Sequence, residues 1–452
     1  MKLPVVMAVG LLGPLAGAHT LFTTLFINGK NQGDGTCVRM PHDSATANGP
    51  VQPITGDDMA CGRDGEKPVA FTCPAPREAT LTFEFRMYST GMRAGVIADD
   101  HKGPCAVYVK KVHDMYADKA AGPGWFKIWE DGYDAATDKW CVDRLIDAKG
   151  LLSVQLPAGL PAGYYLVRPE ILALHNAAAG DAQFFLGCAQ VFVEEGPRGA
   201  LEIPREHQVS IPGHVAAADA GLWFSIWRKP VAAYPMPGPS VYVPGAAGGG
   251  GAAVKLATAK LAQGQGVVPS DCLVKNANWC GRRLAKHSDQ RGCWAAVADC
   301  YRQSQTCWDG APPSGDANCG VWQGYCREAE SGCQAGRFEG PPGFTGQEKM
   351  AEVPGEIPAP WNDAFGARGG AASTTAAPET SATHAAPSAG DAQGEHRGNT
   401  TQSRDGRCGR GLGQTCRGSA FGDCCSGKGW CGQSAQHCGD GCQAQFGGCG
   451  AK

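Results

Sequence analysis

The chain has 22 cysteines, and this even number falls into three groups along the sequence. Thiols stay reduced in the cytosol, so this many paired cysteines are typical of a secreted, disulfide-stabilised protein. Six cysteines lie within residues 19–245, eight within 271–335 and eight within 408–452. We therefore expect three separately cross-linked units.

Residues 1–18 have the pattern of a secretory signal peptide, with Lys2, a short apolar run and a small-residue cleavage site ending at Ala18. Cleavage would leave His19 as the new N-terminus. The α-amino nitrogen and ring Nδ1 of a terminal histidine can chelate one metal ion together, because an amine with a pKa of about 8 yields its proton to a metal near neutral pH. By position alone, the histidine could equally stand there by chance. No later stretch reaches the length of a membrane span, so we expect a soluble, extracellular protein without membrane contact.

Lys and Arg total 40 and Asp and Glu total 43, which gives a formal net charge of −3. Nucleic-acid binding needs clustered Lys and Arg, so we expect no nucleic-acid partner. The chain also holds 65 Gly and 31 Pro, which indicates that part of it is linker. We assign a Gly/Ala linker to residues 246–270 and an Ala/Thr/Ser/Pro linker to residues 336–407. In the second linker, Asn399 begins a sequon and is a candidate for N-glycosylation.

The segment 79–88 alternates between apolar and polar residues, with Leu81, Phe83 and Phe85 pointing to one side. Such alternation predicts a half-buried antiparallel strand. Further short strands are predicted at 105–112, 163–174 and 188–193. Long helical patterns are scarce, so residues 19–245 are predicted to form an immunoglobulin-like antiparallel β-sandwich.

The middle cysteine group has a helical spacing. Three cysteines at seven-residue intervals are followed by a turn-forming segment and three more at the same interval. Seven residues are about two helical turns, so each trio lines one face of a helix. We predict a small disulfide-rich helical hairpin over 271–335, and nothing in it looks catalytic. The predicted pairs are Cys293–Cys333, Cys300–Cys326, Cys307–Cys319 and, by exclusion, Cys272–Cys280.

Three motifs in the sandwich region belong together. The mature start HTLFTTLFING is followed by DDHKGP, which contains His101, and by LALHNA and DAQFFLGCAQ, which contain His175, Gln183 and Phe185. In these motifs residues 19–245 resemble the fungal copper-dependent lytic polysaccharide monooxygenases of auxiliary activity family 9. The resemblance implies one copper ion, held by two nitrogens of His19 and one of His101, since imidazole tolerates both copper oxidation states. It also implies that His175 and Gln183 hydrogen-bond the reacting oxygen species.

Two positions depart from the family pattern. Phe185 occupies the axial position where Tyr is usual, so it lacks the hydroxyl that tunes the site, and Val215 stands where many members have a surface Tyr. Each histidine alone would more often be structural, and their joint occurrence favours the metal site. The resemblance also implies a Cys61–Cys188 disulfide; Cys105–Cys141 and Cys37–Cys73 are suggested for the remaining cysteines.

The C-terminal group contains CCSGKGWCG and eight cysteines, and it resembles a hevein-like chitin-binding module of carbohydrate-binding module family 18. The resemblance implies a sugar site at Ser426, Trp430 and His437. Lys428 stands where an aromatic residue is usual, so weaker chitin binding than usual is expected. The alternative is a disulfide knot that has lost its affinity for sugar.

These observations predict a monomeric, secreted, copper-dependent monooxygenase that cleaves β-1,4-glucan, most simply insoluble cellulose, at C1 or C4. It would use an external electron donor together with H2O2 or O2. The predicted catalytic residues are His19, His101, His175, Gln183 and Phe185. Three alternatives remain: the same chemistry on chitin or hemicellulose, a non-catalytic copper- and chitin-binding wall protein, and a carbohydrate-binding adhesion protein.

Overall fold

The computed structural model describes residues 19–245 and 257–361 and much of the C-terminal region. The described C-terminal residues are 401–403, 408–409, 414–419, 422–426, 431–432, 435–438 and 442–449. The chain divides into two compact units between Ala371 and Ala372. The predicted signal peptide and Asn399 lie outside the described residues. Among the described helices, none is long and apolar enough to cross a membrane.

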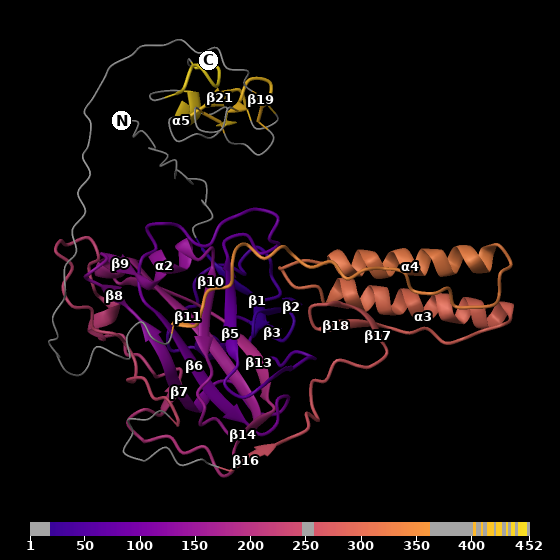
Figure 1. Ribbon diagram of the computed structural model, residues 1–452, viewed down its shortest axis with the longest axis horizontal. Helices are drawn as coiled ribbons and strands as arrows, with labels where there is room; N and C mark the ends of the chain where they lie inside the picture. Colours follow the sequence, from indigo (N-terminus) through magenta and orange to yellow (C-terminus); the bar gives the residue numbers. More distant parts are fainter. Residues whose placement is uncertain are drawn as a thin grey trace, which may run out of the picture. The chain divides into compact units, whose positions relative to one another are not determined.

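Two sheets pack as a β-sandwich in the first unit, as predicted (Figure 1). The smaller sheet has four antiparallel strands in the order β10-β5-β1-β2. These strands are β1 (Leu21–Ile27), β2 (Lys30–Asp34), β5 (Thr80–Arg86) and β10 (Leu151–Gln155).

The larger sheet has eight strands along the path β15-β7-β6-β11-β13-β3, with β12 beside β11 and β4 beside β13. All its pairings are antiparallel except β13 with β4. Its strands are β3 (Val38–Arg39), β4 (Cys73–Ala75), β6 (Cys105–Val112), β7 (Gly122–Asp131), β11 (Gly163–Asn176), β12 (Asp181–Leu186), β13 (Cys188–Val193) and β15 (Val209–Ile211). Short elements complete the sandwich: α1 (Asp58–Cys61), β8 (Tyr133–Asp134), β9 (Lys139–Trp140), α2 (Cys141–Asp147), η1 (Ala177–Ala179) and η2 (Ala220–Leu222).

Strand β5 shows why the apolar pattern folds in this way. Phe83 and Phe85 are at most 1% exposed and join the core between the sheets. The polar side chains that alternate with them, Thr82, Glu84 and Arg86, were predicted to face outward but are buried as well. Arg86 makes this possible because its guanidinium binds the carboxylates of Glu84 and Asp34 at 2.6 and 2.9 Å, so the buried charges are paired. The strand is therefore buried on both faces rather than on one.

The cysteine pairs in the sandwich are those named from the sequence. The structure contains the disulfides Cys37–Cys73, Cys61–Cys188 and Cys105–Cys141. The second of them joins α1 to the start of β13, across 127 residues of chain. Cross-links over such long loops constrain the unfolded chain and stabilise the fold.

Part of the segment predicted to be a Gly/Ala linker is ordered on the sandwich. Strand β16 (Thr258–Lys260) pairs with β14 (Glu195–Pro197). Further along, the carbonyl of Gly266 accepts a hydrogen bond from the amide of Thr72. The composition could not reveal this because backbone groups make these bonds. Residues 246–256 lie outside the described part.

The second cysteine group forms the predicted helical hairpin. Helices α3 (Gln290–Asp309) and α4 (Ala317–Gln334) lie side by side and carry the three predicted cross-links (Figure 1). A small sheet of β17 (Cys272–Asn276) and β18 (Trp279–Arg282) carries the Cys272–Cys280 disulfide and packs on the helices.

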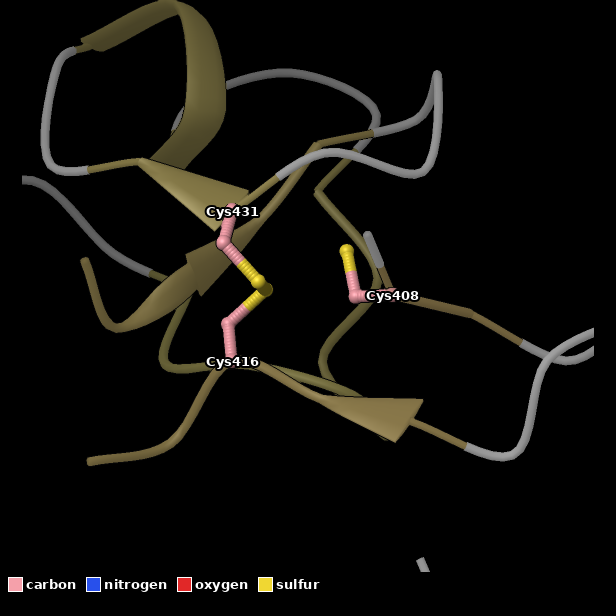
Figure 2. A group of neighbouring side chains, drawn as sticks. All are labelled: Cys408, Cys416 and Cys431. Carbon is pink, nitrogen blue, oxygen red and sulfur yellow. A yellow bond between two sulfur atoms is a disulfide. The ribbon is translucent and has the colours of Figure 1, made fainter. Parts of the chain in front are cut away.

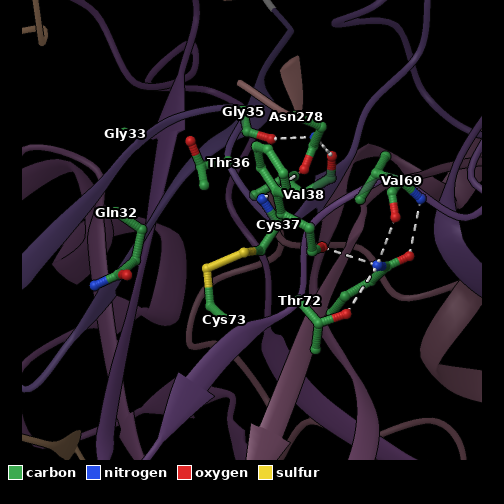
Figure 3. The surroundings of a disulfide bond; sticks show 12 residues. Gln32, Gly33, Gly35, Thr36, Cys37, Val38, Val69, Thr72, Cys73 and Asn278 are labelled. Atoms are coloured by element: carbon green, nitrogen blue, oxygen red, sulfur yellow. Dashed lines mark hydrogen bonds between the residues drawn. A yellow bond between two sulfur atoms is a disulfide. The ribbon is translucent and has the colours of Figure 1, made fainter. Parts of the chain in front are cut away.

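Several hydrogen bonds attach the hairpin unit to the sandwich, and Asn278 makes two of them (Figure 3). Asn278 donates from Nδ2 to the carbonyl of Gly35 at 2.8 Å, and its Oδ1 accepts from the amide of Cys37 at 3.0 Å. Beyond α4, residues 336–361 were predicted to be linker, yet Trp361 packs against the sandwich core and its carbonyl accepts from Nε1 of Trp129. An apolar anchor at its end therefore holds this segment in place.

The C-terminal unit is held together by four disulfides, as expected for so small a module. They are Cys408–Cys425, Cys416–Cys431, Cys424–Cys438 and Cys442–Cys449. Its elements are β19 (Thr401–Gln402), β20 (Gln414–Thr415), β21 (Cys424–Cys425), β22 (Cys431–Gly432) and α5 (Ala435–Cys438). The sulfurs of Cys408, Cys416 and Cys431 lie within 4.8 Å of one another (Figure 2). All three are in disulfides, so none offers a thiolate to a metal.

Candidate metal centre

Three separate stretches of the sequence bring the predicted site residues together. His19 lies two residues before β1, and His101 lies in the loop before β6. His175 lies near the end of β11, and Phe185 lies on β12, the antiparallel neighbour of β11. The N-terminal strand and one edge of the larger sheet therefore meet at this point.

Two imidazole rings face each other across the site. The ring centroids of His19 and His101 are 6.0 Å apart, with the planes inclined at 70°. The Phe185 ring lies beside both, at 5.7 Å from His19 and 6.2 Å from His101, and is 1% exposed. Phe185 thus forms an apolar wall beside the two rings.

The orientation of His101 is set by its neighbour in sequence. Nδ1 of His101 lies 2.7 Å from a carboxylate oxygen of Asp100, and this bond lowers the pKa of Asp100. Carboxylates commonly hold metal-binding histidines in this way, fixing the ring and its tautomer. Nε2 is then the ring nitrogen of His101 available to a metal.

A third histidine supports the second. The His175 ring stacks on the His101 ring with centroids 3.8 Å apart. Burial lowers the pKa of His175, and the neighbouring His101 lowers it further, so the ring is neutral at physiological pH. Its Nδ1 is buried and has no hydrogen-bond partner in the described part of the chain.

Gln183 completes the group from β12, where it lies opposite Ala173 of β11. Its Nε2 donates to the carboxylate of Asp181 at 2.8 Å. Its Oε1 is buried without a hydrogen-bond partner among the described residues. Buried polar atoms are rarely left unpaired, so this oxygen and Nδ1 of His175 point to a missing polar ligand.

The chemistry of the donors fits a nitrogen-ligated transition metal. Burial lowers the pKa of the His19 ring, with a further contribution from His101, which favours the neutral form that binds metals. Neutral imidazole suits copper, zinc, iron and nickel. The residues that the sequence analysis brought together are therefore close in space and chemically matched to a metal.

Exposed aromatic residues near the site were not singled out from the sequence. Trp223 and Trp227 are 54% and 59% exposed, and Nε1 of Trp227 donates to the carbonyl of His175 at 2.8 Å. Val215 stands at the position where a surface Tyr is common in the family that the sequence resembles, and its side chain is buried, with 7% exposure. The sequence signal that could have revealed the two exposed Trp residues is the run GLWFSIW, in which they are four residues apart.

The chain was compared with known proteins. The sequence profile of Auxiliary Activity family 9 (formerly GH61) matches residues 19–234. AA9 family lytic polysaccharide monooxygenase H of Botryotinia fuckeliana (strain B05.10) is 42% identical over 445 residues, which cover 96% of each chain. The chain belongs to auxiliary activity family 9. It is therefore a polysaccharide-oxidising monooxygenase.

Other members of family 9 match shorter stretches. AA9 family lytic polysaccharide monooxygenase C of Aspergillus tamarii is 45% identical over 337 residues, covering 74% of this chain and 89% of the relative. The solved structure titled CvAA9A is 32% identical and covers 50% of this chain and 98% of its own, with a TM-score of 0.44. The match to the Botryotinia enzyme covers 96% of this family 9 protein and so is not confined to residues 19–234.

The C-terminal unit of this family 9 protein is consistent with a hevein-like module of carbohydrate-binding module family 18. Ser426 follows β21 and is 8% exposed, and its carbonyl accepts from Nε2 of Gln443. The His437 ring lies against Gly432, where an added Cβ would come within 2.4 Å of the imidazole. Trp430 and Lys428 lie outside the described residues.

Proposed function

We propose that this protein is a secreted, copper-dependent lytic polysaccharide monooxygenase that cleaves the β-1,4-glucan chains of cellulose. The observation that carries the proposal is the convergence of the His19 and His101 rings beside two buried, unpaired polar atoms. Secretion is supported by the disulfides, which require an oxidising compartment. We expect the enzyme to act as a monomer on an insoluble substrate.

One copper ion would be held by the α-amino nitrogen and ring Nδ1 of His19 and by Nε2 of His101. Bound copper would supply one-electron redox chemistry and, after reduction by an external donor, reactivity toward H2O2 or O2. Asp100 keeps the His101 ring in the orientation that presents Nε2. His175 supports the same ring from its face.

The other side chains set the polarity and the hydration of the space in which the substrate reacts. Gln183 presents Oε1 as a hydrogen-bond acceptor, and Asp181 prevents the amide from turning by accepting from Nε2. Neutral His175 can hold or release a proton at Nδ1. Phe185 excludes water from its side of the site and offers no hydroxyl. Insertion of one oxygen atom at C1 or C4 gives a hydroxylated carbon, which eliminates and breaks the glycosidic bond.

The surface beside the site suits a flat polysaccharide. Aromatic rings stack on the apolar faces of sugar rings, and Trp223 and Trp227 expose their side chains there. The bond from Trp227 to the His175 carbonyl ties this platform to the metal centre. A cellulose surface can lie on such a platform, whereas it could not enter a narrow cleft.

Chitin is the second candidate substrate. The C-terminal unit favours it, through the implied sugar site at Ser426, Trp430 and His437. This unit could also anchor the enzyme to a chitin-containing wall while the first unit attacks cellulose or hemicellulose.

Copper binding tests the proposed ligands directly. The protein beginning at His19 is titrated with Cu(II) by calorimetry, and the bound ion is examined by electron paramagnetic resonance. The matched control carries one Ala before His19, which keeps both rings but converts the amine to a peptide nitrogen. We expect a single tight site with a nitrogen-rich spectrum and a weakened site in the extended protein. Equal affinity in the two proteins would rule out the terminal amine as a ligand.

A further inference from the structure

Three aromatic residues recur along one side of α3. Trp294, Tyr301 and Trp308 follow one another at intervals of seven residues. Seven residues are about two helical turns, so the three side chains leave the helix on one side, about 10 Å apart along its axis. Trp294 and Trp308 are 38% and 39% exposed, which is unusual for such large apolar side chains. We call this row of three residues the α3 aromatic row.

The opposite side of the helix is the one that packs against the rest of the hairpin unit. Ala296, two residues from Trp294 and nearly opposite it on the helix, is buried in a cluster with Val274 of β17 and Trp322 of α4. The small sheet therefore covers the far side of the hairpin. Tyr301 packs against the hairpin core, but packing of the hairpin does not account for the exposed rings of Trp294 and Trp308.

Helix α4 adds a polar border to the row. Tyr301 is half-buried and donates from Oη to the Glu330 carboxylate at 2.6 Å, which places this side of α4 beside the row. Gln323 and Arg327 recur with Glu330 at three- and four-residue intervals, so they share that side. Gly320 continues the same stripe, and an added Cβ there would meet no atom within 4 Å. Glycine lowers helix stability relative to alanine, and at Gly320 the missing side chain leaves the surface beside the row free of bulk.

We propose that the α3 aromatic row is a second polysaccharide-binding surface, which takes one β-1,4-glucan chain of cellulose along the helix axis. The spacing of the rings is about the length of the disaccharide repeat in a β-1,4-linked chain. Successive rings can therefore meet the same face of every second sugar. The amide of Gln323 and the guanidinium of Arg327 supply hydrogen bonds to hydroxyl groups. This surface lies outside the metal centre, and its affinity does not depend on bound copper.

The contacts between the hairpin and the sandwich connect the proposed binding surface to the part of the chain that contains the metal centre. Asn278 joins the hairpin unit to the sandwich, and Trp361 anchors the segment that follows α4. Because both belong to the compact unit that contains the metal centre, a chain held on α3 would retain that unit at the cellulose surface. The proposed chitin site in the C-terminal unit would be a separate anchor.

Retention on cellulose tests this proposal. The full-length secreted protein and a Trp294→Ala/Trp308→Ala variant are incubated with microcrystalline cellulose, and the free fraction is measured at several protein concentrations. We expect the double variant to bind about tenfold more weakly, as the loss of two stacking contacts implies. A Trp294→Phe/Trp308→Phe variant, which keeps flat rings, should retain most of the affinity, and a Leu/Leu variant should not. Unchanged binding in the Ala/Ala variant would overturn the proposal.

Three controls identify the occupant and exclude misfolding. Copper affinity of the Ala/Ala variant should match the wild type and its thermal unfolding should stay close to it, because both rings are more than a third exposed and neither belongs to the hairpin core. Trp430→Ala should lower retention on β-chitin and leave retention on cellulose intact; loss of chitin binding alone in the Ala/Ala variant would contradict a glucan surface. A dimer that becomes monomeric only in the Ala/Ala variant, seen by light scattering, would instead assign the row to self-association and overturn the proposal.

Discussion

His101 stacks face to face on His175, with ring centroids 3.8 Å apart and planes inclined by only 23°. His19 approaches the same His101 ring at a steep angle, 70°, from a greater distance. One imidazole is thus held by its face and by its Nδ1 while its other nitrogen stays available. The arrangement separates the residues that would bind the metal from those that hold the ligand in position.

Asp100→Asn should weaken copper binding about tenfold, the lower end of what outer-shell substitutions cost. The amide cannot stabilise the N–H of His101 as the carboxylate does, so the ring is less firmly oriented. Calorimetry with Cu(II) measures the change. Asp99→Asn is the matched control, because Asp99 is also exposed and adjoins Asp100 in sequence. An equal loss in both variants would show that surface charge, and not orientation of His101, sets the affinity.

Gln183→Ala should reduce the yield of oxidised sugars about a hundredfold and leave copper affinity within a few-fold of wild type. The substitution removes a buried Oε1 that has no hydrogen-bond partner among the described residues, but it removes no proposed ligand. Gln52→Ala serves as the control, since its exposed side chain also contacts the Asp181 carboxylate, at 3.5 Å. Product yield and copper titration are measured together. Full activity in Gln183→Ala would remove this residue from the proposed mechanism.

The ion pair of Glu170 should make the stability of the fold depend on pH. Burial alone would raise its pKa, but the Arg168 guanidinium 2.6 Å away, together with His214, outweighs burial and holds the pKa of Glu170 at about 2, below its ordinary 4.5. A lowered carboxyl pKa stabilises the fold above pH 4.5, and this contribution is lost as the pH falls toward 2. Glu170→Gln should cost about 3–5 kcal/mol at neutral pH, because it leaves the buried Arg168 unpaired.

Thermal unfolding between pH 2 and 7 checks this difference. The difference in unfolding temperature between the wild type and Glu170→Gln should be largest above pH 4.5 and should decrease as the pH approaches 2. Glu206→Gln, at an exposed position, should follow the wild type throughout. A gap that stays constant across the range would mean that the Glu170 charge does not contribute.

Asn278→Ala should loosen the hairpin unit from the sandwich. It leaves the Cys37 amide and the Gly35 carbonyl without their partner (Figure 3), at a cost of about 1–3 kcal/mol. Hydrogen exchange at the Cys37 amide should speed up, and the hairpin should become more sensitive to protease. Asn278→Asp keeps an acceptor for Cys37 but loses the donor to Gly35, so it should fall between. Exchange at wild-type rates in Asn278→Ala would show that other contacts hold the two parts together.

The hairpin could be predicted from the sequence because the helical period is a local property. Cysteines seven residues apart must share a helix face, and the pairs Cys293–Cys333 and Cys300–Cys326 follow from joining two such faces. The ordered path of residues 336–361 could not be predicted in this way. It depends on Trp361 meeting the sandwich core, a contact between distant segments that composition does not encode.

The site likewise has residues that the sequence predicts and residues that it does not. His19, His101, His175 and Gln183 stand in recognisable motifs, and the structure brings them together. The role of Asp100 was not predicted, because an acidic residue beside a histidine is common on protein surfaces. The exposed Trp223 and Trp227 were overlooked for a similar reason. A Trp-rich segment is typical of a buried core, and the sequence alone does not show that these side chains are exposed.

Analysis of reaction products tests the central claim most directly. The copper-loaded protein with a mature His19 terminus is incubated with ascorbate on amorphous cellulose and, in parallel, on β-chitin, and soluble products are identified by mass spectrometry. We predict aldonic acids or C4-ketone sugars from cellulose, absent without ascorbate and absent in His19→Ala. No oxidised product from either polymer, in protein that demonstrably holds copper, would contradict the account.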